Sequence, residues 1–259
     1  MKHPKVDYDR LANSYNQRFE HDPSTGIIQT LHELTHSTGA ELILETGSGT
    51  GKFLSHLSTQ VIAAVGLDLS SGMLTQARQR QPPMHLVQGR AGHLPFARDC
   101  FDLIYCVNAI HHFDQPQRFI QAAIDGMRPG GLVAVIGSDP HADGHHWYVH
   151  DYFEGVLETD LARFPPHLQI LRWMEEVGLQ DLERREIEHI HDEHRGRSVL
   201  EDPFLRKEAT SQLALLSQDT YQAGLDRIRS ELEKAEALGQ EMVFQADLSI
   251  FLLSGLKPA

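Results

Sequence analysis

The chain has 259 residues, and its 36 acidic side chains outnumber its 23 basic ones, which gives a formal net charge of −13. This length suits one large domain or two small ones and allows a sizeable core. The acidic excess disfavours nucleic acid and anionic membrane surfaces as partners, because both are bound through Lys and Arg. Two cysteines cannot form a disulfide framework, and the start has no apolar signal sequence, so we expect a cytoplasmic protein. The 17 histidines are the unusual feature of the composition.

Strands and helices alternate in the first half of the chain. Amphipathic helices are predicted over residues 1–40, with a break at 22–24. Short apolar runs then predict strands at 42–44, 61–67, 84–88, 101–107 and 131–137. Helices are predicted between them at 52–58, 71–80 and 117–127. This alternation predicts an α/β fold with a parallel sheet that is buried on both faces.

The pattern changes after residue 138. The second half is predicted to contain a polar, histidine-rich segment at 141–164, a helix at 167–177, an extended segment at 182–190, a helical region at 198–238 and a strand at 243–256. We therefore expect the last two strands of the sheet to form a hairpin, with a helical insertion between them. No stretch has the composition of a flexible linker, so a single domain is expected.

A glycine-rich turn follows the first predicted strand. Gly47, Gly49 and Gly51 lie in the sequence ETGSGTG, where glycine permits a tight turn and lets a ligand approach the backbone. Asp68 ends the next strand, near the offset at which a carboxylate accepts the two hydroxyls of a ribose. The spacing of the glycines differs from that of a Walker loop and of a dinucleotide fold. The sequence therefore predicts a nucleoside-containing cofactor at the carboxyl ends of the strands.

The turn, preceded by Glu45, resembles the first motif of the class I S-adenosylmethionine-dependent methyltransferases, of the ubiquinone-biosynthesis-like or small-molecule type. Residues 68–73 are similar to the second motif of that family, and 89–104 to its third and fourth segments. The turn at 129–131 resembles the one before the fifth strand of the family. Residues 8–15 resemble the N-terminal helix that closes over the cofactor.

The resemblance implies a Rossmann-like class I methyltransferase fold, with a seven-stranded, mostly parallel sheet, helices on both faces and a helical lid insertion. It implies S-adenosyl-L-methionine as the cofactor and S-adenosyl-L-homocysteine as its product. In the family, the acid at Asp68 binds the ribose and the side chain at Met73 lies against adenine. The residues that the resemblance places around the cofactor are Tyr8, Tyr15, Arg18, Glu45, Gly47, Gly49, Gly51, Asp68, Leu69, Met73, Arg90, Ala91 and Asn108.

Arg90 departs from the family pattern, which has Asp at this position to accept a hydrogen bond from the adenine amino group. Arginine has only donors, so it cannot replace that contact. Adenine is then expected to be recognised by the backbone of Ala91, by another side chain or through water. Arg90 itself is expected to contact a ring or to pair with an acid.

Two histidines, His111 and His112, follow the fourth predicted strand, at the mouth of the expected site. Methyl transfer to a neutral nucleophile requires a general base, for which histidine is suited. In the phosphoethanolamine branch of the superfamily a tyrosine of the N-terminal helix pairs with a histidine in this turn, and Tyr15 and His112 match these places loosely. We expect His112, His111 and Tyr15 to be catalytic, and of the two histidines we favour His112 as the base. The alternative is that the pair only caps a helix.

Two further histidine clusters lie at 141–150 and 189–194. Neither has the helical spacing of a metalloprotease or a cysteine partner, so we expect no metal ligand. Substrate contact and a solvated loop are the two remaining interpretations. His146, Trp147 and Tyr152 follow the fifth strand, where the family builds its substrate wall, and we expect them to line the substrate site. Packing within a lid is the alternative for the aromatic pair.

The predicted function is methyl transfer from S-adenosylmethionine to a small-molecule acceptor through an O, N or C nucleophile, by in-line displacement. A protein methyltransferase and a non-catalytic cofactor-binding regulator are the alternatives. No nucleic-acid or membrane partner is expected, and the chain is expected to be a monomer or a homodimer. The expected single domain consists of cap helices at 1–40, the cofactor core at 41–138, lid segments at 139–165 and 196–240, and the end of the sheet at 166–195 and 241–259.

Overall fold

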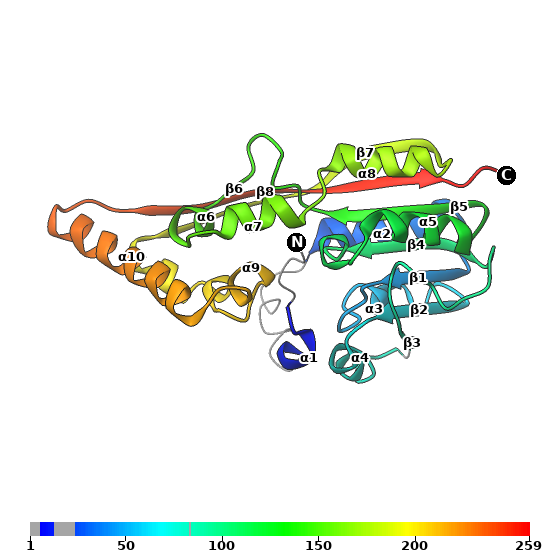
Figure 1. Cartoon of the computed structure of the whole chain (residues 1–259), viewed down its shortest axis with the longest axis horizontal. Helices are drawn as coiled ribbons and strands as arrows, with labels where there is room; N and C mark the ends of the chain where they lie inside the picture. Colours follow the sequence, from blue (N-terminus) through cyan, green and yellow to red (C-terminus); the bar gives the residue numbers. More distant parts are fainter. Residues whose placement is uncertain (1–5, 13–23, 83) are drawn as a thin grey trace.

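Figure 1 shows the computed structural model, which describes residues 6–12, 24–82 and 84–259. Its strands form one sheet in the order β3-β2-β1-β4-β5-β8-β6, and β7 is a further partner of β8. The strands are β1 (Leu42–Thr46), β2 (Ala63–Asp68), β3 (His85–Gln88), β4 (Phe101–Val107), β5 (Met127–Gly137), β6 (His146–Trp147), β7 (Gln180–Arg195) and β8 (Val243–Leu256). β1 to β5 are parallel, whereas β8 is antiparallel to its neighbours. The predicted Rossmann-like sheet is confirmed, with the short β6 as an addition.

Helices cover both faces of the parallel strands. They are α2 (Thr25–Ser37), α3 (Leu54–Leu57), α4 (Ser71–Ala77), α5 (Pro116–Gly126) and α8 (His167–Glu176), and the short α1 (Tyr8–Leu11) precedes them. In β4, Ile104 and Cys106 belong to the core cluster shared with α5 and α8, whereas Leu103 and Tyr105 belong to the one shared with α2 and α3. Successive side chains of a strand point to opposite faces, so burial on both faces explains the continuous apolar run.

The strand order reverses beside β1, since β2 and β3 lie on one side of it and β4 and β5 on the other. In open α/β sheets, ligands bind outside the carboxyl ends of the strands at such a switch point. The turns after β1, β2 and β4 begin at Thr46, Asp68 and Val107. The fold therefore brings the glycine turn, Asp68 and the histidine pair to one edge of the sheet.

A second group of elements, which we call the outer lobe, is built on the long β7–β8 hairpin. It comprises β6, α6 (Tyr148–Tyr152), α7 (Val156–Arg163), η3 (Gly196–Glu201), η4 (Pro203–Leu205), α9 (Ser211–Ala214) and α10 (Gln218–Ala237). Its own apolar cluster includes Tyr148, Phe153, Ile228 and Phe244. In Figure 1 it lies along the part of the hairpin that extends away from the parallel strands. The segments predicted as a lid lie largely in this lobe.

Three segments of the second half differ from their predicted structure. Residues 198–238 do not form a continuous helical region, because the side chains of Thr210 and Ser217 cap new helices by accepting hydrogen bonds from the backbone three residues later. The strand expected at 182–190 is part of the longer β7. The segment at 141–164, for which no element was predicted, contains β6, α6 and α7. Among the described residues, no helix combines the length and apolar character needed to cross a membrane.

The packing of the outer lobe can be tested at Gly224 of α10. A Cβ atom added there would collide with the ring of Phe153. We expect Gly224→Ala to lower the free energy of unfolding by about 1–2 kcal/mol. Overlap with three ring atoms puts the overpacking cost in the upper part of its usual range, at about 2–3 kcal/mol, and alanine recovers about 1 kcal/mol of helix propensity. Urea unfolding measures this difference. Gln222→Ala, at an exposed position of the same helix, should stay within about 0.5 kcal/mol of the wild type. Equal stability of Gly224→Ala and wild type would contradict the packing described.

Candidate active site

The turn after β1 depends on three glycines in left-handed conformations. Gly47, Gly49 and Gly51 have φ values of +69°, +54° and +71°. A Cβ at Gly47 would lie 2.7 Å from Cβ of Ala109, and one at Gly51 would lie 2.8 Å from Cε of Met84. A Cβ at Gly49 would meet nothing within 4 Å. Packing therefore requires glycine at position 47, whereas at Gly51 the end of the flexible Met84 side chain could move and the left-handed backbone is what favours glycine. Gly49 borders open space where a ligand can approach the backbone.

Asp68 connects the end of β2 to this turn. Its Oδ2 accepts a hydrogen bond from the backbone N–H of Gly49 at 2.8 Å, and its Oδ1 accepts one from the N–H of Ser70, also at 2.8 Å. Burial raises the pKa of the Asp68 carboxyl above its ordinary value, while the backbone donors oppose that shift. Each carboxylate oxygen can accept more than one hydrogen bond, so both remain able to accept from a ribose.

Glu45 supports the turn from within the protein. Its side chain is buried, and Oε2 accepts a hydrogen bond from the backbone N–H of Leu54 at 3.1 Å. Burial raises the pKa of Glu45 well above its ordinary value. On the other side of the turn, Nε of Arg80 donates to the carbonyl of Thr50 at 2.6 Å. These contacts hold the turn in shape, and a direct contact of Glu45 with the cofactor stays a prediction.

Helix α1 contacts this edge of the sheet at two places. The hydroxyl of Tyr8 lies 2.7 Å from Nε2 of His112, in the turn after β4. Oδ1 of Asp9 accepts hydrogen bonds from the backbone N–H of Gly72 and the hydroxyl of Ser70, both at 2.7 Å, beside Asp68. The helix therefore connects the end of β2 to the end of β4. Tyr8, expected at the cofactor, is the tyrosine that pairs with His112 here.

Tyr15 and Arg18, which were expected at the catalytic and cofactor sites, lie outside the described residues. The remaining predicted cofactor residues lie at the same edge. Leu69 is half exposed beside Asp68, whereas Met73 and Ala91 are buried. Asn108 has a left-handed φ of +48°, and its N–H donates to the carbonyl of Ile136 at 2.8 Å.

Arg90 pairs with an acid, which was one of its two expected roles. Its Nη1 lies 2.6 Å from Oδ2 of Asp114, and both side chains are largely exposed. Its donors are thus directed at the turn after β4. Arg90 and Asp114 together join that turn to the segment after β3.

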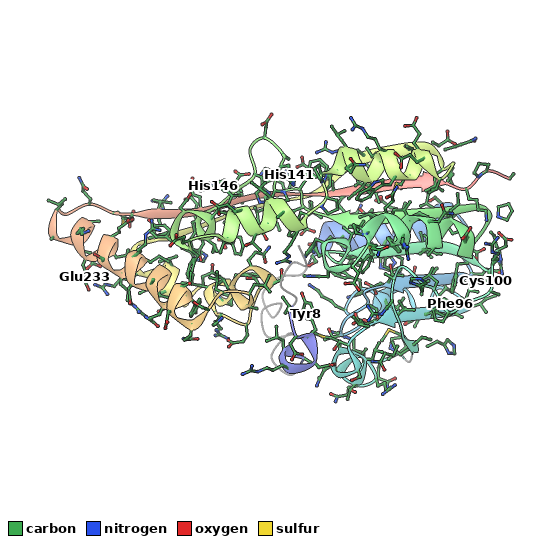
Figure 2. The ribbon with its side chains drawn as sticks, in the orientation of Figure 1. Tyr8, Phe96, Cys100, His141, His146 and Glu233 are labelled. Atoms are coloured by element: carbon green, nitrogen blue, oxygen red, sulfur yellow. The ribbon has the colours of Figure 1, made fainter. Side chains whose placement is uncertain are left out.

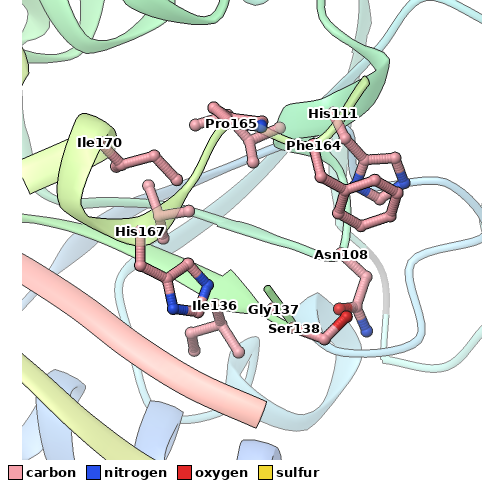
Figure 3. Close-up of a pocket in the computed structure, with 11 residues that line it drawn as sticks. Asn108, His111, Ile136, Gly137, Ser138, Phe164, Pro165, His167 and Ile170 are labelled. Carbon is pink, nitrogen blue, oxygen red and sulfur yellow. The ribbon is translucent and has the colours of Figure 1, made fainter. Parts of the chain in front are cut away.

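A cavity opens beside the histidine pair, at the carboxyl ends of β4 and β5 (Figure 3). Its lining includes Asn108, His111, Ser138, Phe164 and His167. The ring of His111 stacks on that of Phe164, with centroids 3.8 Å apart and planes at 13°. The cavity is thus lined by both apolar surface and hydrogen-bonding groups, as small-molecule sites usually are.

His167 is a site residue that the sequence analysis did not single out. It begins α8 and is almost fully buried, and its Nδ1 has no hydrogen-bond partner. Burial lowers its pKa to about 4, so the ring is neutral at pH 7. The only sequence signal was its place directly after Pro165 and Pro166, at the start of a helix.

Helix α7 contributes two further buried polar atoms without a hydrogen-bond partner, Oδ1 of Asp160 and Nη1 of Arg163. Nη2 of Arg163 donates to the hydroxyl of Ser211 at 2.9 Å, and the guanidinium lies 5.8 Å from the ring centroid of Phe164. An unpaired buried polar atom costs free energy, so a ligand that pairs with these atoms would bind favourably.

The residues expected to line the substrate site lie in the outer lobe and do not line this cavity. His146, labelled in Figure 2, is exposed on β6. Trp147 packs edge-on against His150, with ring centroids 5.6 Å apart. The hydroxyl of Tyr152 donates to Glu231 at 2.7 Å. The structure thus does not bring these three together with the histidine pair, and their contact with a substrate stays a prediction.

Two histidines, the buried His167 and the partly buried His145, should make the stability of the protein depend on pH. Burial lowers the pKa of both His145 and His167 to about 4. In the unfolded chain their pKa is about 6.5. The unfolded state therefore binds protons that the folded state does not, and the free energy of unfolding should fall as the pH is lowered from about 7 towards 4.

Urea unfolding at pH 7 and at about pH 5.5 measures this loss. His145→Gln/His167→Gln should lose less stability between the two pH values than the wild type. The control His85→Gln/His93→Gln removes two exposed histidines and should keep the slope of the wild type. The same pH dependence in all three proteins would show that the buried rings are not the cause.

A family model described as a methyltransferase domain matches residues 44–135. The chain is 31% identical over 136 residues to an uncharacterized methyltransferase of Synechocystis, covering 51% of this chain and 63% of that protein. It is 30% identical over 131 residues to the phthiotriol/phenolphthiotriol dimycocerosates methyltransferase of Mycobacterium tuberculosis, covering 49% of this chain and 45% of that protein. The match spans about half the length of these curated relatives.

Solved structures show the same fold at low sequence identity. A putative methyltransferase from an antibiotic biosynthesis pathway of Anabaena variabilis superposes with a TM-score of 0.70 at 21% identity, covering 88% of this chain and 96% of that one. Phosphoethanolamine N-methyltransferase 2 of Haemonchus contortus gives 0.60 at 16% identity, covering 97% of this chain and 57% of that one. The sheet order and these superpositions show the Rossmann-like fold of the class I methyltransferases, and the part of the chain that matches a methyltransferase domain carries the glycine turn and Asp68.

Proposed function

We propose that this chain transfers the methyl group of S-adenosylmethionine to a small-molecule acceptor. One observation carries the proposal: helix α1 links a ribose-type carboxylate site to a tyrosine–histidine pair. Asp9 bonds to the backbone beside Asp68, and the neighbouring Tyr8 bonds to His112. A cofactor site and a proton-accepting group thus lie at one edge of the sheet.

The residues at this edge fit the cofactor. Asp68 would accept the two ribose hydroxyls, and the open space at Gly49 would admit the rest of the nucleoside. Half-exposed Leu69 offers apolar surface to adenine, and the backbone of Ala91 would offer it hydrogen-bonding groups. When bound, S-adenosylmethionine supplies a methyl group that its sulfonium already activates. The protein then has to position the acceptor, exclude water and accept a proton.

His112 is our candidate for the group that accepts the proton. Its Nε2 lies 2.7 Å from the hydroxyl of Tyr8, which orients the ring and can pass a proton to or from it. His111, by contrast, stacks on Phe164 and forms part of the cavity wall. This division makes His112 the general base, Tyr8 its partner and His111 a residue that positions the acceptor.

The cavity and the charge of the chain support a small acceptor rather than a nucleic acid. Phe164 and Ile136 provide apolar walls, and His167 and Asn108 provide hydrogen-bonding groups. The net charge of −13 opposes a phosphate backbone. Two of the similar proteins are named for phthiotriol dimycocerosates and for phosphoethanolamine, which are not macromolecular acceptors. We expect the enzyme to act in the cytoplasm, as a monomer or a homodimer.

Cofactor binding depends on the Asp68 carboxylate. Asp68→Ala should weaken the binding of S-adenosylhomocysteine by roughly 100-fold or more, since a hydrogen bond to a charged group contributes about 1.5–3 kcal/mol and two are lost. Isothermal titration calorimetry measures the affinity. Glu233→Gln, on the exposed surface of α10, removes a carboxylate elsewhere and should bind as the wild type does. Unchanged affinity in Asp68→Ala would refute the site assignment.

Catalysis depends on the His112–Tyr8 pair. Replacing a general base lowers kcat by about 10²–10⁴-fold, so His112→Gln should do this while retaining most of the affinity for S-adenosylhomocysteine. Tyr8→Phe should lower kcat less, because it leaves the imidazole in place. The measurement is formation of S-adenosylhomocysteine with acceptors that present a hydroxyl, an amine or an activated carbon. Full turnover by His112→Gln would exclude it as the base.

The same assay separates the alternatives. A protein methyltransferase would form S-adenosylhomocysteine only with polypeptide acceptors, and an inactive binding protein would form none with any acceptor while still binding the cofactor.

A further inference from the structure

Three side chains of metal-ligand type converge on the exposed face of the β7–β8 hairpin. Nε2 of His189 lies 2.9 Å from Oδ1 of Asp247, and Nδ1 of His191 lies 3.2 Å from Oδ2 of the same residue. One ligand atom from each residue falls within 4.8 Å of the others. None of the three lines the cavity at His111 or contacts the glycine turn, so methyl transfer does not account for them.

The backbone register fixes this convergence. His191 of β7 is directly opposite Asp247 of β8, and His189 is two residues away on the same strand. Opposed residues of paired strands share a face of the sheet, as do residues two apart along a strand. On its other side Asp247 is opposite His146 of β6, whose side chain therefore also leaves the sheet on this face. No loop has to move for the three groups to meet.

Carboxylates also flank the outer nitrogens of both imidazoles. Oε1 of Glu186 lies 3.4 Å from Nδ1 of His189, and Oε1 of Glu193 lies 3.7 Å from Nε2 of His191. Each ring thus faces Asp247 with one nitrogen and a second carboxylate with the other. Histidines that bind metals typically have such a carboxylate at the remaining nitrogen, where it fixes the tautomer and raises the basicity of the ligand.

The local charge favours a cation. Asp247, Glu186 and Glu193 bring three carboxylates to the cluster, and within the part of the chain that the structure describes only Glu193 of these three is paired with an arginine, Arg195, at 3.0 Å. All three ligand side chains are exposed by more than a third, so a hydrated ion can reach them.

We propose that His189, His191 and Asp247 form a divalent-metal site that binds zinc, which revises the expectation from the sequence that the 189–194 cluster holds no metal ligand. Two imidazoles and one carboxylate suit zinc, which binds nitrogen and oxygen ligands at about 2.0–2.2 Å, and water would complete a tetrahedral set. The observed separations of 2.9 and 3.2 Å between ligand atoms are close to the spacing of neighbouring ligands around such an ion.

The position of the site indicates what the metal would do. Residues 251–256 of β8 pair with β5 in the core sheet, whereas Phe244 belongs to the apolar cluster of the outer lobe. Asp247 lies between these two parts. A bound ion would therefore join β7 to β8 where the hairpin leaves the core, and would hold the outer lobe in a fixed orientation.

The test is zinc titration of the metal-free full chain, in competition with a chromogenic chelator, together with thermal unfolding. We expect the wild type to bind one equivalent of zinc and its Tm to rise. Asp247→Asn and His189→Gln/His191→Gln should bind zinc at least about 10-fold more weakly and lose the Tm rise, because each lacks a direct ligand. Cobalt provides a second readout, since a tetrahedral site gives intense visible bands that the variants should lack.

His85→Gln/His93→Gln is the matched control, because it also removes two exposed histidines, from β3 and the segment after it. It should retain the zinc affinity and the Tm rise of the wild type. Circular dichroism without metal, and binding of S-adenosylhomocysteine, establish that each variant is folded. The proposal is overturned if the wild type binds no equivalent of zinc. It is also overturned if Asp247→Asn binds zinc as tightly as the wild type, or if the control binds zinc as weakly as the ligand variants are expected to.

Discussion

The cofactor edge of this protein depends on the hydrogen bond between the Gly49 N–H and the Asp68 carboxylate. It joins the turns after two neighbouring parallel strands, and it requires a left-handed backbone at Gly49, which glycine adopts without strain. Glu45 and Arg80 hold the same turn from the other side. Because both oxygens of Asp68 are oriented by the backbone, the carboxylate is positioned before any ligand binds, and less ordering is required on binding.

Helix α1 connects the Asp68 carboxylate site to the residues proposed for catalysis. It has four residues, so its position depends on tertiary contacts rather than on helix propensity. Asp9 fixes it beside Asp68, and Tyr8 fixes it to His112. Helix α1 thus contacts both ends of the edge at which we propose that the cofactor binds. The cavity at Phe164 lies on the far side of the histidine pair, where an acceptor could approach separately.

The sequence predicted the part of the site whose residues are close along the chain. The turn at 47–51 and Asp68 are separated by one helix and one strand, so local periodicity places them together. Arg90 was recognised as a departure, and its ion pair with Asp114 follows from its having only donors. The fold class was predictable for the same reason, since β1 to β5 and their helices form consecutive units.

Contacts between distant segments could not be predicted in this way. His167 and Phe164 reach the cavity only because the chain returns across β5, and Asp247 meets His189 and His191 only through the register of a hairpin with a long insertion. The most direct test of the account is a crystal structure of the complex with S-adenosylhomocysteine. We predict that the ribose hydroxyls bond to Asp68 and that the sulfur faces the His112–Tyr8 pair. A ligand bound elsewhere, or with its sulfur directed away from that pair, would contradict it.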